Sequence, residues 1–95
     1  MINRYRQGYL AELELVKILK RSPQYHSVLR SAGSRSPFDV VAIGESEILL
    51  CQVKTGGQGR YASEQRALEQ LRVPKNVQKE IWIYRNREWQ IVPVP

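Results

Sequence analysis

The chain has 95 residues, of which 42% are hydrophobic and 25% charged, a composition that is typical of one small globular domain and excludes a disordered chain. A domain of this length, residues 1–95, is close to the lower limit for a self-sufficient hydrophobic core, so we expect a homodimer. The formal net charge is +6, which favours a polyanionic partner, most simply nucleic acid.

The numbers of cysteine and histidine residues and the length of the apolar runs exclude several further classes of protein. The single cysteine, Cys51, excludes an internal disulfide framework and fits a reducing cytosol. With His26 as its one histidine, the chain lacks the ligands for a structural zinc site. No apolar run approaches the length of a membrane span and no signal-peptide pattern opens the chain, so we expect a cytoplasmic protein with no membrane partner.

Apolar residues near the start of the chain recur at helical spacing and predict a helix over about 4–21. Asn3 can cap the start of this helix, and Ser22-Pro23 ends it. Glu12 falls within the apolar arc, whereas Glu14 falls on the opposite, solvated face. Because an unpaired carboxylate is rarely buried, two interpretations of Glu12 remain. It snorkels to solvent at the helix end, or it has a cation partner from a side chain or a metal ion.

A strand is predicted over 24–32, and it leads into a polar loop. The loop reads Arg30-Ser31-Ala32-Gly33-Ser34-Arg35-Ser36. Its glycine permits a tight turn, and its hydroxyl and guanidinium groups suit phosphate oxygens and sugars. A flexible polar loop without a ligand is the alternative interpretation.

Two apolar, β-branched runs, 38–43 and 48–53, are separated by a short polar break, which is the pattern of a β-hairpin. A symmetric turn over this break puts Asp39 opposite Gln52, and a four-residue loop keeps the same register. Side chains alternate between the faces of a strand, so Lys54 lies on the same face as Gln52. The hairpin therefore gathers a carboxylate, an amide and an ammonium group in one small area.

The residues of this cluster leave two interpretations open. In the structural one, Asp39 and Lys54 form an ion pair near a sheet end, and Gln52 satisfies a backbone group. In the functional one, the cluster is a divalent-metal site for phosphodiester chemistry. Asp39 and Gln52 would supply hard oxygen ligands, and Lys54 would orient or help deprotonate the attacking water.

The second half of the chain predicts a flexible link over 55–59, a helix over 63–72, and strands over 80–84 and 88–94. The whole order, αβββαββ, predicts an α/β fold with a mixed sheet. The second helix is expected to bury Ala67, Leu68 and Leu71.

Basic and aromatic residues of this half are given mainly structural roles. We expect a solvated face, adding to the field that attracts DNA, from Arg66, Arg72, Lys75 and Lys79. Trp82 and Trp89 are expected to pack in the core, with base stacking as the alternative.

Four motifs lie in order along the first half of the chain: Gly8-x-x-x-Glu12-x-Glu14-Leu15-Val16, Arg30-Ser31-Ala32-Gly33-Ser34, Asp39-Val40-Val41-Ala42 and Gln52-Val53-Lys54. This set, with its spacing, resembles the archaeal-type Holliday junction resolvases of the PD-(D/E)XK nuclease superfamily. The resemblance implies a restriction-endonuclease-like αβββαββ core with helices flanking the sheet. It also implies a metal-dependent DNA endonuclease that cuts four-way junctions as a homodimer.

The same resemblance implies roles for individual residues. The implied catalytic residues are Glu12, Asp39, Gln52, Lys54 and Ser34. Glu12, Asp39 and Gln52 would bind Mg²⁺, with Mn²⁺ as an alternative, while Lys54 would assist the water and Ser34 would lie in the active-site loop. We expect DNA to be bound by Arg4, Arg6, Arg30, Ser31, Ser34, Arg35 and Arg60.

Gln52 departs from the family pattern, in which this position is normally Glu. An amide carbonyl is still a hard oxygen ligand, but the exchange removes one negative charge, so we expect weaker Mg²⁺ binding. Three functions therefore remain open: a junction-cutting endonuclease, a nuclease for another structured DNA, and a DNA-binding protein that kept the nuclease fold and lost catalysis.

Overall fold

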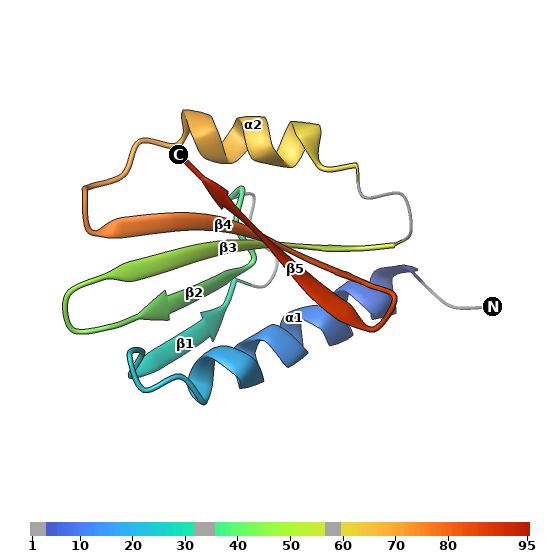
Figure 1. The fold of residues 1–95 in the computed structure, drawn as a ribbon, viewed down its shortest axis with the longest axis horizontal. Helices are drawn as coiled ribbons and strands as arrows, with labels where there is room; N and C mark the ends of the chain where they lie inside the picture. Colours follow the sequence, from blue (N-terminus) through green and yellow to red (C-terminus); the bar gives the residue numbers. More distant parts are fainter. Residues whose placement is uncertain (1–3, 32–35, 57–59) are drawn as a thin grey trace.

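The computed structural model describes residues 4–31, 36–56 and 60–95. Its elements are α1 (Arg4–Lys20), β1 (Ser27–Arg30), β2 (Val40–Ile43), β3 (Ile48–Thr55), α2 (Ala62–Gln70), β4 (Val77–Arg85) and β5 (Glu88–Val94). The predicted order αβββαββ is confirmed, and the fold is α/β (Figure 1). Neither α1 nor α2, the helices of the described ranges, has the length and apolar character needed to cross a membrane.

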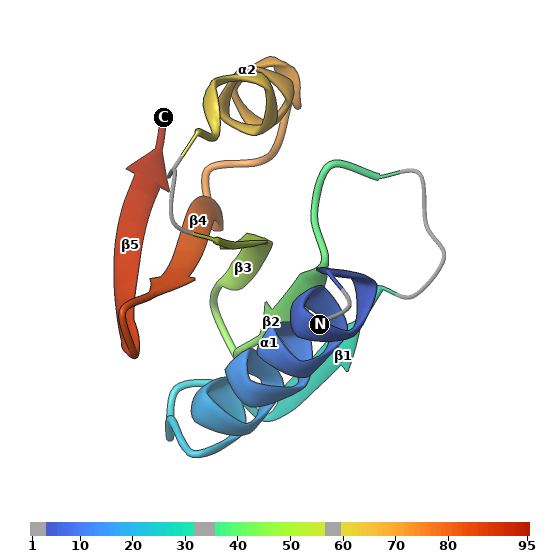
Figure 2. The same cartoon turned by 90° about the vertical axis from the view of Figure 1, so that its right-hand side faces the viewer.

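The strands of the described ranges form one mixed sheet in the order β1-β2-β3-β4-β5. β3 and β4 are parallel, and the other neighbouring pairs are antiparallel. Two parallel strands need a crossover connection, and α2 lies within that connection on one face of the sheet. α1 lies on the opposite face (Figure 2).

The predicted hairpin register is confirmed. Val40 pairs with Cys51 and Ile43 pairs with Ile48, so a four-residue loop joins β2 to β3. Inside the loop, the Gly44 N–H donates to the carbonyl of Glu47 at 2.8 Å. A Cβ at Gly44 would collide with the backbone carbonyl of Gln24, which explains why glycine suits this position.

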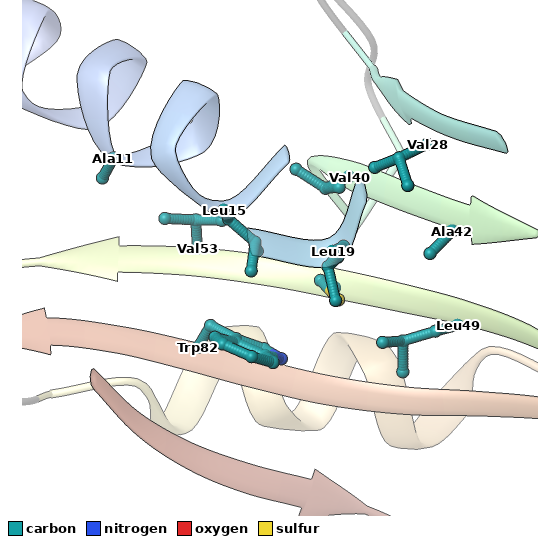
Figure 3. Packing of buried hydrophobic residues seen from close by; sticks show 10 residues of the cluster. Ala11, Leu15, Leu19, Val28, Val40, Ala42, Leu49, Val53 and Trp82 are labelled. Atoms are coloured by element: carbon teal, nitrogen blue, oxygen red, sulfur yellow. The ribbon is translucent and has the colours of Figure 1, made fainter. Parts of the chain in front are cut away.

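The core has one cluster on each face of the sheet, because alternate residues of each strand point to opposite faces. The α1 face holds Ala11, Leu15, Leu19, Val28, Val40, Ala42, Leu49, Cys51, Val53 and Trp82 (Figure 3). The α2 face holds Leu68, Ile81, Ile83 and Val94. Trp82 is buried, and its ring meets the ring of the half-buried Trp89 edge-on, with the two ring centres 5.7 Å apart. Packing in the core is therefore confirmed for Trp82.

Several predicted boundaries and burials were wrong. β1 begins at Ser27 rather than at 24, because β2 offers partners only from Val40 to Ile43. β4 begins at Val77 rather than at 80, because its backbone pairs with β3 from Ile48 onward. On α2, Leu68 is fully buried and Leu71 half-buried, but Ala67 is exposed.

Lys79 is the main correction to the predicted solvated face, because its side chain is buried. The residue is 7% exposed, and its Nζ donates to the carbonyls of Leu68 at 2.6 Å and Leu71 at 3.1 Å. Carbonyls at the C-terminal end of a helix have no partner within the helix, and a cation is favourable there. Lys79 therefore ties β4 to the end of α2.

Replacing Lys79 tests this tie. We expect Lys79→Met to lower the free energy of unfolding by about 2 kcal/mol, because a hydrogen bond to a charged group contributes roughly 1.5–3 kcal/mol and methionine has no donor. Chemical denaturation measures this change. Lys75→Met, at an exposed position just before β4, is the matched control and should leave stability nearly unchanged. Equal stability of both variants would contradict the assigned role.

Candidate functional site

One end of the sheet gathers most of the predicted site residues. Arg30 and Cys51 both pair with Val40, so β1 ends, β2 begins and β3 approaches its end at the same place. Asp39 precedes β2 here, and Lys54 lies three residues beyond Cys51 on β3. We call this the site end; it is on the right of Figure 1 and faces the viewer in Figure 2.

Asp39 is half-buried at the start of β2. Its Oδ2 accepts a hydrogen bond from the Val53 N–H at 2.9 Å, and its own N–H donates to the Cys51 carbonyl at 2.7 Å. Burial raises the pKa of Asp39 above its usual value, although the Val53 N–H and the charges of Lys54 and Arg30 oppose the increase. Among the described residues, the backbone holds this carboxylate in place, and no cation is hydrogen-bonded to it.

Glu12 projects from α1 to the same end and has a cation partner. Its Oε1 accepts a hydrogen bond from Arg30 at 3.2 Å, and the Arg30 guanidinium lies 4.7 Å from the centre of the Tyr9 ring. Burial and the charge of Asp39 raise the pKa of Glu12, against the lowering effect of Arg30. The repulsion between the two carboxylates shows that Glu12 and Asp39 are close enough to influence each other.

Lys54 forms an ion pair that the sequence did not indicate. Its Nζ lies 3.0 Å from Oε2 of Glu64, in the first turn of α2. The pKa of Glu64 is lowered: burial acts to raise it, but the hydrogen bond and charge of Lys54 outweigh that effect. No ion pair joins Lys54 to Asp39 within the described ranges, so the predicted structural pair was wrong in its partner.

Gln52 is half-buried on β3, two residues before Lys54 and therefore on the same face. Among the residues that the structure describes, its side chain forms no hydrogen bond. Its amide oxygen thus has lone pairs that no described donor uses. The expectation that Gln52 satisfies a backbone group was wrong for this part of the chain.

The predicted DNA-binding residues have different surroundings. Arg6 and Arg60 are exposed, whereas Arg30 is engaged with Glu12. The Ser31 hydroxyl is half-buried, 3.5 Å from the hydroxyl of Ser36. Outside the described part of the chain lie Ser34, Arg35 and the side chain of Arg4.

Neighbouring charges at the site end change the pKa values of its carboxyl groups. Carboxylates with raised pKa values are typical of functional sites, although structural ion-pair networks produce them as well. No three His, Cys, Asp or Glu side chains of the described residues are placed to hold a metal ion together. Among the described residues, the acidic side chains at this end that are not paired with Lys54 are Glu12 and Asp39, and Gln52 lies on the neighbouring strand β3.

Replacing Asp39 with a neutral residue tests whether burial of its ionised carboxylate lowers the stability of the fold. Because the folded-state pKa of Asp39 is raised, its ionised form destabilises the fold at neutral pH, and this penalty fades as pH falls towards its ordinary pKa of 3.8. We expect Asp39→Asn, which keeps an oxygen for the Val53 N–H, to raise the denaturation midpoint at neutral pH. The gain should shrink as the pH is lowered.

Glu45→Gln, at an exposed position in the β2–β3 loop, is the matched control and should show no such gain. A lower midpoint for Asp39→Asn at neutral pH would mean that ionised Asp39 stabilises the fold.

No protein-family model matches the chain, and no curated protein is similar to it at a significant level. The resemblance to junction resolvases therefore rests on the sequence motifs alone and stays a prediction.

Proposed function

We propose that this protein is a metal-dependent DNA endonuclease that hydrolyses phosphodiester bonds in branched DNA, with a four-way junction as its expected substrate. The observation that carries the proposal is the meeting of Glu12, Asp39 and Lys54 at one end of the sheet. These residues come from a helix, a strand start and a strand end; the charge of Asp39 acts on the pKa of Glu12, and the charge of Lys54 acts on the pKa of Asp39. The same three positions carry the resemblance to nuclease motifs.

The donor set at the site end suits a small hard cation. The charge of Asp39 acts to raise the pKa of Glu12, and a cation held by these carboxylates would oppose that effect. The amide of Gln52 adds a neutral oxygen, and Mg²⁺ is commonly held by one or two carboxylates together with water and phosphate. When bound, the metal polarises the scissile phosphate and increases the acidity of the attacking water.

The side chains of the chain itself position the reaction. Lys54 places a positive charge beside Asp39, where it orients the attacking water and stabilises the charge that develops on the phosphate. Glu64 limits the freedom of Lys54 through the ion pair at 3.0 Å. α2 holds Glu64 in place because Leu68 is fully buried and Lys79 binds the end of the helix.

The positive charge of the chain and the symmetry of a homodimer both suit a DNA junction as substrate. The net charge of +6, with Arg6 and Arg60 exposed, supports salt-dependent attraction to the phosphate backbone. A homodimer would present two such sites, one for each of two strands of a junction. Both the dimer and the junction are inferred from the resemblance and the small size of the domain.

A second function is favoured by one specific observation. Gln52 brings no charge, Arg30 already neutralises Glu12, and Glu64 already neutralises Lys54. Because these side-chain charges are already paired, the folded site would not need a metal ion to neutralise them. The protein would then be a DNA-binding module that kept the nuclease fold and lost catalysis. A nuclease for a different structured DNA is a third function with the same site.

Alanine variants at the site test the reaction. We expect Asp39→Ala and Lys54→Ala each to slow metal-dependent cleavage of a labelled four-way junction by on the order of 10²- to 10⁴-fold, the usual contribution of a catalytic group. Junction affinity in EDTA should change little. Glu69→Ala, at an exposed position on α2, is the control and should cut normally. Unchanged cleavage by both site variants would remove this assignment.

Restoring a carboxylate at position 52 separates the two main functions. We expect the wild type to cut the junction in preference to matched linear duplex, and Gln52→Glu to reach the same rate at lower Mg²⁺ concentration, because a third negative charge strengthens metal binding. A titration of cleavage rate against Mg²⁺ measures this shift. Cleavage by Gln52→Glu alone would favour the DNA-binding module. If neither protein cuts or binds the junction, the inferred substrate class is wrong.

A further inference from the structure

A groove of about 530 Å³ lies beside the site end. Its walls come from α1 between Gln7 and Glu14, the end of β3 and the turn between β4 and β5, and they include Leu10, Tyr84, Asn86 and Trp89. The N-terminal half of α1 and the β4–β5 turn lie at the same end of the molecule (Figure 1). A volume of this size is typical of pockets that bind small ligands.

We infer that this groove binds an unpaired nucleobase of the DNA that occupies the neighbouring site. The inference rests on the proposed function and names a feature of its substrate. The groove and the site lie at the same end of the sheet: Thr55 and Gly56, which line the groove, directly follow Lys54 in the chain, and Ala11, which also lines it, precedes Glu12. DNA bound at the site end would therefore lie near the groove.

Aromatic rings form one wall of the groove. The rings of Tyr84 and Trp89 are 5.0 Å apart and tilted by 54°, and Trp82 supports Trp89 from the core side. Tyr84 is 37% exposed and Leu10 is 50% exposed, so apolar surface faces the opening. Every base has an apolar face that stacks on such rings, independent of sequence.

Polar groups around the rings have unused hydrogen-bonding capacity. Within the described ranges, the amides of Gln7 and Asn86 and the indole N–H of Trp89 make no hydrogen bond to another side chain or to the backbone. Arg85 lies at the rim, where Gln90 accepts a hydrogen bond from it at 2.7 Å. This combination suits a flat ligand with an apolar face, a polar edge and a phosphate attached.

The turn that closes the groove also carries positive charge. Asn86 and Arg87 adopt φ values of 53° and 62°, which is the backbone of a two-residue hairpin turn. Arg85 and Asn86 line the groove, and Arg87 follows them in the turn. A second copy of this chain is the other candidate occupant, but a wall of two aromatic rings beside Arg85 matches a nucleotide better than it matches the basic surface of a copy.

Three labelled duplexes test the inference by fluorescence anisotropy in EDTA, so that no strand is cut. One duplex is fully paired, one carries a single extra adenosine, and one carries an abasic nucleotide in place of that adenosine. We expect the wild type to bind the adenosine duplex roughly ten-fold more tightly than the abasic duplex, since stacking of one base on an aromatic side chain has about this effect.

Groove variants identify where the base binds. Two variants, Tyr84→Ala and Leu10→Ala, remove side chains from the groove. In each of them, the affinity for the adenosine duplex should approach the affinity for the abasic duplex, so that their ratio falls from about ten towards one. Affinity for the fully paired duplex should stay within about two-fold of wild type. Leu29→Ala is the matched control: Leu29 is 58% exposed on β1, outside the groove, and its replacement should keep the preference. Circular dichroism checks that each variant is folded.

Each other result overturns the inference. Equal wild-type affinity for all three duplexes would refute the nucleobase site and leave the proposed function standing. A preference that survives in both folded groove variants would mean that the base binds elsewhere. Loss of a dimer in the groove variants, without any base preference in the wild type, would assign the groove to contacts between copies. Failure to bind any duplex, even at low salt, would refute the proposed function as well.

Discussion

The parallel pairing of β3 with β4 is the constraint on which the rest of the structure depends. Parallel neighbours cannot be joined by a tight turn, so the chain must cross one face of the sheet, and α2 lies in that crossover. The crossover brings Glu64 to Lys54 at the start of α2 and the carbonyl of Leu68 to Lys79 near its end. α1 is left to cover the opposite face. The ends of the strands between the two helices then become the place where charged side chains from both faces meet.

The electrostatics of the site end suggest function because they oppose stability. Glu12 and Asp39 both have raised pKa values, so ionisation of each carboxyl group costs the fold some stability. Lys54 hydrogen bonds to Glu64, and Asp39 accepts a hydrogen bond from the Val53 N–H, so the two opposite charges of Asp39 and Lys54 are not joined by a hydrogen bond. Natural proteins tolerate such costs mainly where activity requires them.

The groove and the site lie at the same end of the sheet. Both are close to the end of β3, where Lys54 belongs to the site and Thr55 and Gly56 line the groove. Phosphate contacts position a nucleic acid, whereas contacts with a base distinguish its form. In the proposed function, the site end would make the first kind of contact and the groove the second. Such a division would suit recognition of DNA by its departures from a regular duplex rather than by its sequence.

The sequence by itself determined the order of the elements, the β2–β3 register and the inward direction of Glu12. These features depend on short-range periodicity and on a local turn, so neighbouring residues are sufficient to predict them. The tertiary structure alone decided that Arg30 pairs with Glu12, that Glu64 holds Lys54 and that Lys79 is buried. It also decided that Trp82 is buried while Trp89 lines a groove. Each of these outcomes depends on which face of the sheet a distant helix or strand covers, and that choice is made by long-range packing that no local pattern records.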